Sequence, residues 1–389
     1  MKIGFDAKRA FFNNTGLGNY SRTLIKSLVK YYPDNQYILY SPKSIQNSPF
    51  AEIQNFKNIE VKIPQTRFQK LFDGSVWRSL QLGNQIKSDQ LDIYHGLSHE
   101  LPRNIHRSRP QTKNIVTIHD LIFLRYPDLY SKIDRLIYRQ KWKYACQQAD
   151  KVIAISEQTK SDIIEFLGIE ASKIEVVYQG CHPSFYDYND AIFLQHGLFK
   201  QDNIEVPYDL PEEYILYVGS ITERKNLLTI AKALHIMKGS LNPHLVVVGD
   251  GGAYKQQVVN YLQQHGLQKS VTFLSNIPNE HLPNIYRKAL VMVYPSLFEG
   301  FGIPIIEALF SRTPVITSDN DCSCFREAAG EGALYVNPLD AEELAHAIEE
   351  AMTNGAVRIQ LMANGWNHVD QFREEEVVGR MMEVYQGIT

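Results

Sequence analysis

The 389-residue chain has only four cysteines, and their spacing excludes two common roles. Cys146 and Cys181 stand alone, and Cys322 and Cys324 form a C-x-C pair without further ligands, so neither a disulfide framework nor a zinc site is expected. Reduced cytosolic thiols fit this usage. Long apolar runs are also missing: the longest have about six residues, whereas a helix that crosses a bilayer needs ~18.

The N-terminus lacks the apolar segment of a signal peptide, because Asp6, Lys8 and Arg9 stand in its place. The chain contains no P-loop, H-E-x-x-H or G-x-S-x-G motif. It also contains no run of acidic residues suited to chelating a metal-bound diphosphate. We therefore expect a cytoplasmic protein that is not secreted and holds no metal ion.

The composition is that of a globular protein, with 44% apolar and 21% charged residues. The net charge of −3 is unevenly distributed. Residues 1–205 carry 27 basic and 21 acidic side chains, and the remainder carries 13 and 22. A basic first half suits an anionic partner such as phospholipid headgroups, a pyrophosphate or nucleic acid. Chance explains the imbalance equally well.

Short β-branched runs alternate with helix-length segments along the chain. Strands are expected at 2–6, 36–41, 91–95, 114–119, 151–156, 174–178, 214–218, 244–249, 271–274, 290–294, 314–318 and 333–336. Runs that are apolar on both faces and are followed by helices indicate parallel sheets. Two such series predict an α/β fold with two doubly wound domains, whose ligands bind at the carboxyl ends of the strands.

The most informative motif is YPSLFEGFGIPIIEALFSRTPVI, residues 294–316. A strand runs into a loop, and a helix is expected near Pro304, whose fixed φ suits the first helical position. Gly300 and Gly302 allow close approach of a ligand to the backbone. The N–H groups of Phe301, Gly302 and Ile303 have no partner within the helix and form an anion site fitted for phosphate.

Two carboxylates accompany this loop. Glu299 lies in it, and Glu307 follows one turn into the helix. Carboxylates repel phosphate but accept hydrogen bonds from hydroxyls, for which a sugar or a ribose is the natural donor. The plainer alternative is a solvated loop beside a helical glutamate.

A second motif, YVGSITERKNLLTIAKAL, covers residues 217–234. A strand ends at Gly219, and the turn that follows carries Arg224 and Lys225. Two adjacent cations at the carboxyl end of a strand can neutralise a diphosphate leaving group. Ordinary surface basicity is the alternative for the pair taken by itself.

Three further signals are weaker. Gly16 and Gly18 stand between the first strand and the first helix, where a tight turn is an equally good explanation. The glycines of LVVVGDGGAYKQQV, residues 245–258, do not match the dinucleotide fingerprint. His119 ends a strand and could contact substrate, although a capping or core histidine is the commoner case.

With these motifs the chain resembles the retaining glycosyltransferases of family 4, which have the GT-B fold of two Rossmann-like domains facing a central cleft. The resemblance rests on the E-x7-E motif from Glu299 to Glu307, the Arg224-Lys225 pair, and the segments TGLGNY and HDLIFLRYP. These occur in the family's order along essentially the whole chain. The similarity is greatest to bacterial mannosyltransferases that build polysaccharides or lipid-linked glycans.

Residues 181–213 have prolines and acids but little periodicity, so a linker and the domain boundary are expected there. The resemblance implies that the domain before it, 1–180, is the acceptor-side domain and that the domain after it, 214–369, binds the nucleotide sugar. A helix over about 370–389 would return to the first domain. Phe325 stands two residues before Glu327, in a segment where relatives often have proline before the glutamate.

The family also implies a role for each site residue. Glu307 would bind the donor ribose, Glu299 the hydroxyls of the transferred sugar, and the amides of 300–303 the sugar and phosphate. Arg224 and Lys225 would stabilise the departing nucleoside diphosphate.

The remaining implied roles concern the rest of the donor and the reacting sugar. His119 would lie beside the reacting sugar, Gly16 and Gly18 would allow the first domain to close over the diphosphate, and Gly219 would contribute backbone to donor binding. His182 stands where the linker of relatives often has aspartate.

These roles imply a metal-independent transfer of a hexose with retention of configuration, with no cofactor besides the nucleotide-sugar donor. GDP-mannose is the donor expected by resemblance, a glycan or lipid-linked glycan is the acceptor, and no nucleic acid is involved. A UDP-sugar-dependent transferase, a nucleotide-sugar epimerase of the same fold and a non-catalytic binding protein are the alternatives.

A contact with an anionic membrane is a further expectation. Residues 67–87, RFQKLFDGSVWRSLQLGNQIK, interleave basic side chains with aromatic and aliphatic ones. Peripheral binding to the inner face of the membrane is one interpretation. A helix whose apolar residues, among them Trp77 and Leu80, form its buried face is the other, and the sequence favours neither.

Overall fold

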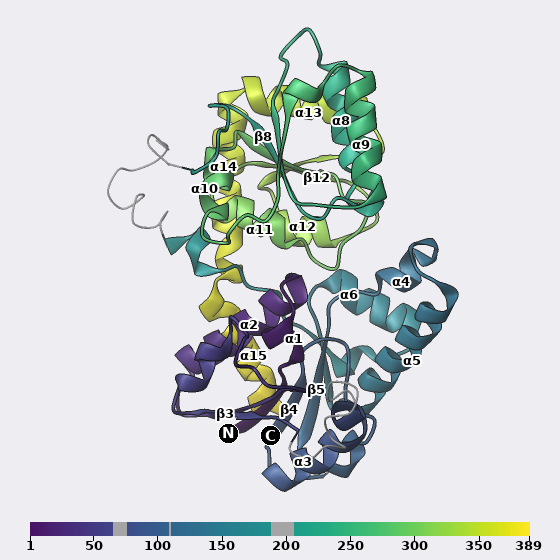
Figure 1. Ribbon diagram of the computed structural model, residues 1–389, viewed down its shortest axis with the longest axis vertical. Helices are drawn as coiled ribbons and strands as arrows, with labels where there is room; N and C mark the ends of the chain where they lie inside the picture. Colours follow the sequence, from purple (N-terminus) through teal and green to yellow (C-terminus); the bar gives the residue numbers. More distant parts are fainter. Residues whose placement is uncertain (65–75, 109, 188–205) are drawn as a thin grey trace. The chain divides into compact units, whose positions relative to one another are not determined.

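The computed structural model describes residues 1–64, 76–108, 110–187 and 206–389. The chain divides into two compact units, of which unit 1 comprises Met1–Gly180 with Glu374–Thr389 and unit 2 comprises Cys181–Arg373. Each unit contains one parallel β-sheet covered by helices (Figure 1). The predicted pair of doubly wound α/β domains is therefore confirmed.

The sheet of unit 1 has seven strands in the order β3-β2-β1-β4-β5-β6-β7. They are β1 (Lys2–Asp6), β2 (Gln36–Tyr40), β3 (Ile59–Lys62), β4 (Ile93–Gly96), β5 (Lys113–Ile118), β6 (Lys151–Ala154) and β7 (Ile174–Val176). The helices are α1 (Lys8–Phe12), α2 (Gly16–Tyr31), α3 (Leu82–Asp89), α4 (Ile122–Arg125), α5 (Lys132–Gln148), α6 (Glu157–Asp162) and α15 (Glu374–Ile388).

Strand β2 shows why this sheet is buried on both faces. Tyr37 and Leu39 belong to a core cluster that also contains residues of α1, α2 and α15. Ile38 and Tyr40, which alternate with them, belong to a second cluster with residues of α3 and α5. Successive side chains of a strand point to opposite faces, so one short apolar run serves both cores.

Helix α15 completes the core of unit 1 although it follows all of unit 2 in the sequence. Its buried residues include Val377, Met381 and Tyr385. The Tyr385 hydroxyl lies 2.7 Å from Nδ1 of His95, and Nε2 of His95 lies 2.8 Å from the Thr117 hydroxyl. Burial lowers the pKa of His95 to about 3, so this histidine is neutral and structural.

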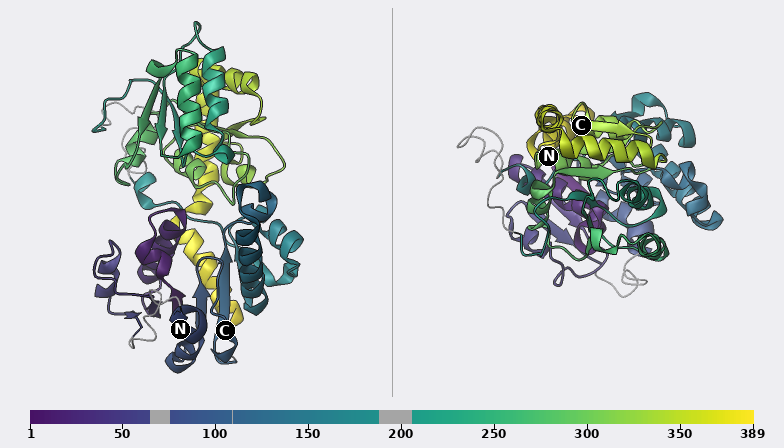
Figure 2. Two further views of the ribbon diagram at one scale, coloured as in Figure 1. Left: turned by 45° about the vertical axis from the view of Figure 1, so that its right-hand side comes forward. Right: turned by 90° about the horizontal axis from the view of Figure 1, so that it is seen from above.

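The sheet of unit 2 has six strands in the order β10-β9-β8-β11-β12-β13. They are β8 (Ile215–Val218), β9 (Leu245–Val248), β10 (Val271–Leu274), β11 (Val291–Tyr294), β12 (Val315–Ser318) and β13 (Ala333–Val336). The helices are α8 (Leu227–Ile236), α9 (Ala253–Gln264), α10 (Leu282–Lys288), α11 (Ile303–Phe310), α12 (Cys324–Ala329), α13 (Ala341–Thr353) and α14 (Gly355–Val369). Helices α8, α9 and α13 share one core with the sheet (Figure 2).

The segment expected as a linker, 181–213, belongs to unit 2 where it is described. Arg287 of α10 donates hydrogen bonds to the carbonyl oxygens of Ser184 and Phe185 over 2.9 and 3.2 Å, which fixes the start of this segment on the unit. Residues 188–205 lie outside the described residues.

Candidate active site

The site residues predicted in unit 2 lie at the carboxyl ends of β8 and β11. These strands are neighbours, and the order of strands along the sheet reverses between them. A 3-10 turn over Glu223–Lys225 follows β8 and carries both cations, and the loop after β11 carries Glu299. Ligands of open α/β sheets bind at such a switch point.

Glu299 holds the two cations together. Its Oε1 lies 2.7 Å from Nη1 of Arg224 and 2.7 Å from Nζ of Lys225. The hydroxyls of Tyr294 and Ser296 donate to the same oxygen over 2.9 and 2.7 Å. Burial by itself would raise the pKa of Glu299, but Lys225 and Arg224 outweigh it and lower that pKa to about 2. Glu299 is therefore a carboxylate at neutral pH.

The three charged side chains are nearly buried and carry one net positive charge. Their exposed fractions lie between 11% and 16%. Burial lowers the pKa of Lys225, and the nearby Glu299 opposes this shift. The Lys225 ammonium also lies 4.9 Å from the ring centroid of Tyr294, which fixes its position. A partly desolvated site with excess positive charge attracts an anion.

Gly302 shapes the loop before α11. Its φ of 129° lies in a region that side chains with a Cβ rarely adopt. The carbonyl of Gly302 accepts from the amide of Ile305 at 2.9 Å, and Pro304 occupies the first turn. The buried ring of Phe301 packs edge to face on Phe372, with the centroids 5.3 Å apart. Gly300 to Ile303 thus bring their backbone to the start of α11, where a helix favours an anion.

Glu307 lies in α11 and has a very different environment from Glu299. Its Oε2 accepts a hydrogen bond of 2.8 Å from the hydroxyl of Tyr286. Burial raises the pKa of Glu307 to about 7, and the bond from Tyr286 opposes the rise only in part. The two carboxylates of the E-x7-E motif therefore have very different pKa values. Glu299 is kept ionised by the two cations, whereas Glu307 is close to half protonated at neutral pH.

Close backbone approach explains the glycines at the ends of β8 and β9. A Cβ on Gly249 would lie 1.9 Å from the carbonyl oxygen of Gly219, and one on Gly251 would lie 2.2 Å from that of Ile221. Gly219 itself has a φ of 151° and lies beside the aliphatic part of Lys225. The GDGG segment, which did not fit a dinucleotide fingerprint, therefore serves to pack the turn that carries the two cations.

The predicted site residues of unit 1 are held in a dense polar setting. His119 is buried, its Nε2 lies 2.9 Å from the carbonyl of Leu97, and its Nδ1 lies 2.8 Å from the amide nitrogen of Gln179. Burial lowers the pKa of His119 to about 4, so the ring is neutral. Both ring nitrogens have protein partners, and a role beside the reacting sugar stays a prediction.

The two glycines at the start of α2 differ in what they do. Gly18 packs so tightly that a Cβ would lie 1.8 Å from the carbonyl oxygen of Asn13, whereas a Cβ on Gly16 would meet nothing within 4 Å. The two glycines lie in the first turn of the second helix and not, as expected, between the first strand and the first helix, because α1 intervenes. Gly18 is required there by the close approach of Asn13. Gly16 has room around it, which is compatible with the predicted contact to a diphosphate.

Sequence reasoning missed the side chains that support the charged residues. Tyr294 and Ser296 bind Glu299, Tyr286 binds Glu307, and Asn226 donates to the carbonyls of Pro295 and Pro338. Asn226 has a φ of 58°, a conformation that asparagine tolerates better than most residues. Its place directly after Arg224-Lys225 is the signal that could have marked it.

The segment expected to contact a membrane is only partly described, because 67–75 lies outside the described residues. Trp77 is buried in a core cluster of unit 1. Arg78 pairs with Asp6 at 2.7 Å and with Glu100 at 2.6 Å. Leu80, in contrast, is 53% exposed, so the described part of the segment has one buried and one exposed apolar side chain and both interpretations stay predictions. In the part of the chain that the structure covers, no helix is both long and apolar enough to cross a membrane.

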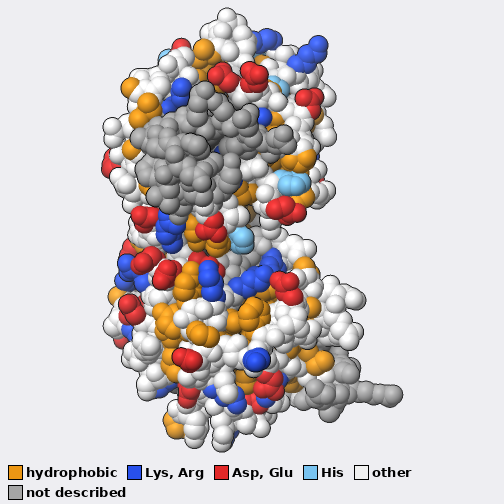
Figure 3. All heavy atoms as spheres, turned by 90° about the vertical axis from the view of Figure 1, so that its left-hand side faces the viewer, with side chains coloured by type: hydrophobic (Ala, Val, Ile, Leu, Met, Phe, Trp, Pro, Cys, Tyr) orange, Lys and Arg blue, Asp and Glu red, His pale blue; other side chains and the backbone are white. Residues whose placement is uncertain are grey.

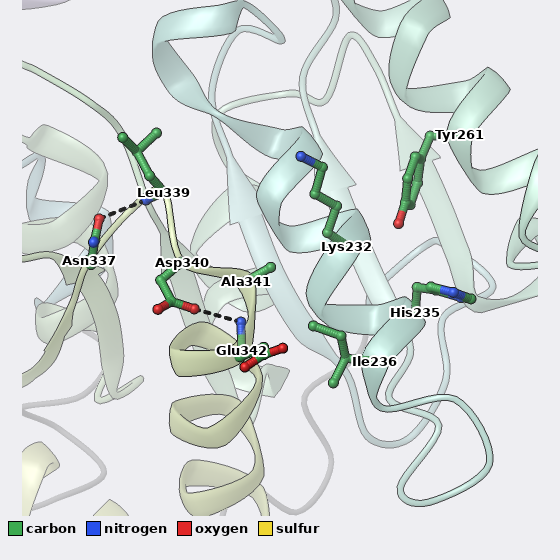
Figure 4. A pocket seen from close by; sticks show the side chains of 9 residues that line it. All are labelled: Lys232, His235, Ile236, Tyr261, Asn337, Leu339, Asp340, Ala341 and Glu342. Carbon is green, nitrogen blue, oxygen red and sulfur yellow. Dashed lines mark hydrogen bonds between the residues drawn. The ribbon is translucent and has the colours of Figure 1, made fainter.

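A shallow hollow of about 570 Å³ lies elsewhere in unit 2, beside α8 and the start of α13 (Figure 4). Lys232, Tyr261 and Asp340 are among the residues that line it. The Asp340 carboxylate already accepts from the amides of Glu342 and Glu343, so it caps α13. We assign no catalytic role to this hollow, since the predicted site residues do not line it.

The described residues contain no group of three or more His, Cys, Asp or Glu side chains that could hold a metal ion. Metal independence stays a prediction that chemistry must test.

Comparison with known proteins identifies the class of protein. The family model for glycosyl transferases group 1 matches residues 200–368, and that for glycosyltransferase family 4 matches 15–185. An O-antigen chain mannosyltransferase B of Escherichia coli is 26% identical and covers 99% of this chain and 100% of its own. The O-antigen chain mannosyltransferase RfbU of Salmonella typhimurium is 32% identical over 63% of this chain and 62% of its own.

Solved structures agree with this result at the level of the fold. Sucrose-phosphate synthase from Thermosynechococcus elongatus superposes with a TM-score of 0.73 at 22% identity, covering 100% of this chain and 99% of its own. The two family models together cover most of the chain, in the same order as the two sheets. The chain therefore belongs to the family 4 glycosyltransferases and has the GT-B fold.

Proposed function

We propose that this glycosyltransferase transfers a mannosyl group from GDP-mannose to a glycan or a lipid-linked glycan, with retention of configuration and without a metal ion. The observation that carries the proposal is the buried group of Arg224, Lys225 and Glu299 with its net positive charge. The two mannosyltransferase relatives support mannose as the transferred sugar.

The bond that breaks joins the anomeric carbon of the sugar to the diphosphate oxygen, and its electrons leave with the nucleoside diphosphate. Arg224 and Lys225 would stabilise the negative charge that grows on this group in the transition state. Helix α11 directs its positive end to the same loop and adds to the effect. Positive charge from the chain itself would then replace a divalent cation.

Glu299 would accept hydrogen bonds from hydroxyls of the transferred sugar, and Glu307 from those of the ribose. Both carboxylates are then occupied as acceptors, which argues against either as a covalent nucleophile. The acceptor hydroxyl would attack the face that the diphosphate leaves, and its proton would pass to a diphosphate oxygen. A new glycosidic bond and a protonated nucleoside diphosphate are the products.

A donor panel tests this assignment. GDP-mannose, UDP-glucose and related nucleotide sugars are incubated with the enzyme, with and without an extract that contains glycan acceptors. Release of GDP that requires the acceptor supports the proposal, and release of UDP instead indicates a UDP-sugar donor. Nucleotide release without any acceptor indicates an epimerase. A thermal shift without turnover indicates a binding protein.

A further inference from the structure

Helix α5 exposes an apolar stripe that the fold does not use. Ile133, Leu136 and Ile137 are 71%, 58% and 42% exposed, and Leu129 just before the helix is 45% exposed. Positions i, i+3 and i+4 of a helix lie on one face, so the three side chains in α5 form one continuous surface. Single exposed apolar residues are normal, whereas a contiguous group marks an interaction site.

The opposite face of α5 already packs against unit 1. Ala145 and Cys146 are buried in a core cluster, and Tyr138 and Trp142 pack against it. The ring of Trp142 stacks on His99 with the centroids 4.0 Å apart. The helix is thus apolar on two sides, one of which covers the core, and the outer stripe contributes nothing to that packing.

Basic residues flank the outer stripe. Lys132, Arg139 and Lys143 are spaced i, i+7 and i+11, which aligns them in a row beside Leu136. Arg135 and Lys141 bring the number of cations in the helix to five, and Asp134 is its one acid. Asp134 is tied to the N-cap, because its carboxylate accepts from the Ser131 hydroxyl at 2.7 Å.

Helix α5 lies at the outer edge of the unit in Figures 1 and 2. On the face turned away from α5, acidic and basic side chains are interspersed over unit 1 (Figure 3). Exposed apolar side chains beside a row of cations are what a helix lying in the interface of an anionic bilayer presents.

We propose that α5 is the membrane-docking element of this protein, with Ile133, Leu136 and Ile137 entering the headgroup region of an anionic leaflet and Lys132, Arg139 and Lys143 binding lipid phosphates. This is a different surface from the segment 67–87. A second copy of the chain is a poorer occupant, because it would bring a second row of Lys132, Arg139 and Lys143 close to the first. The proposal does not depend on which sugar is transferred.

Co-sedimentation with vesicles tests the proposal. We compare vesicles of phosphatidylcholine alone with vesicles that also contain roughly 30% phosphatidylglycerol, each at low and at high salt. We expect binding to the anionic vesicles only, with release at high salt. Each removed cation should weaken the partition about fivefold, so that Lys132→Ala with Arg139→Ala weakens it roughly 25-fold.

Matched variants separate docking from folding. Ile133→Ser with Ile137→Ser should abolish binding, whereas Ile359→Ser, which is 52% exposed in unit 2, should not. Lys269→Glu, an exposed charge in unit 2, controls for net charge. Thermal unfolding should be the same for all variants, and donor consumption with a soluble acceptor should not change. These two measurements separate this proposal from the proposed function.

Equal binding to both kinds of vesicle, absent binding, or binding that survives both α5 variants would overturn the proposal. A wild-type dimer that the α5 variants convert to a monomer would also overturn it, in favour of a second copy as the occupant.

Discussion

The pKa of Glu307 leads to a prediction about how donor binding depends on pH. If Glu307 accepts hydrogen bonds from the ribose hydroxyls, only its ionised form binds the donor well. With a pKa of about 7, about nine tenths of Glu307 is ionised at pH 8 and about one tenth at pH 6. The donor should therefore bind roughly tenfold more weakly at pH 6 than at pH 8.

Isothermal titration calorimetry from pH 5.5 to 8.5 measures this dependence, at about half-unit steps. The ligand is the intact nucleotide sugar, because its diphosphate is esterified at both ends and does not titrate in this range. Glu307→Gln keeps an oxygen that can accept from Tyr286 but cannot ionise, so its affinity should be low and flat across the range. A flat wild-type profile, or the same slope in Glu307→Gln, would refute the assignment.

The pH dependence of folding stability gives an independent check, because stability should fall as pH rises, whereas donor binding should become stronger. The folded-state pKa of Glu307, about 7, lies above the value of 4.5 expected for an exposed glutamate. The folded protein therefore holds more protons between these two pH values, and its stability falls as pH rises through them. Above pH 7 the buried, ionised carboxylate lowers the free energy of unfolding by about 3 kcal/mol. The Glu307→Gln variant should therefore be more stable than the wild type by about this amount at pH 8, and should show no such gain at pH 4. Chemical denaturation at both pH values measures the difference.

Three further predictions follow from the same site. Lys225→Ala should lower kcat more than it raises the donor KM, because charge on the diphosphate grows in the transition state; an effect on KM alone would show that Lys225 only tethers the donor. Activity should survive EDTA in full, and a loss that magnesium restores would contradict the assigned neutralisation of the diphosphate. Gly249→Ala should lower the Tm of unit 2 by several degrees, because its Cβ would meet the Gly219 carbonyl, whereas the helical Gly355→Ala should not.

The strands of the fold were predictable from sequence wherever a strand is buried on both faces. The run from 36 to 41 is apolar at successive positions, and the structure has β2 there with its residues divided between two cores. Strand β3 was not predicted, because its sequence, I-E-V-K, has charged residues at alternate positions and is not apolar on both faces.

The sequence was sufficient to predict which types of residue form the site, but not which of these residues contact one another. Carboxylates and cations near strand ends could be read from 217–234 and 294–316, whereas the contact of Glu299 with Lys225 joins segments far apart in the chain. The opposite pKa shifts of Glu299 and Glu307 depend on these contacts and on burial. Trp77 shows the same limit, since a basic and aromatic pattern does not reveal which side of a helix faces the core.

The path of the chain through α15 has a consequence for synthesis on the ribosome. The strands of unit 1 are made first, but Val377, Met381 and Tyr385 of its core emerge only after the whole of unit 2. Domains generally begin to fold as they emerge, so unit 1 must wait with part of one face of its sheet uncovered while unit 2 folds, although α1 and α2 already cover the rest of that face. Nascent chains stalled before α15 should therefore contain a protease-resistant unit 2 beside a protease-sensitive unit 1. Chaperones that bind exposed apolar surface would have their longest access to the first half of this protein.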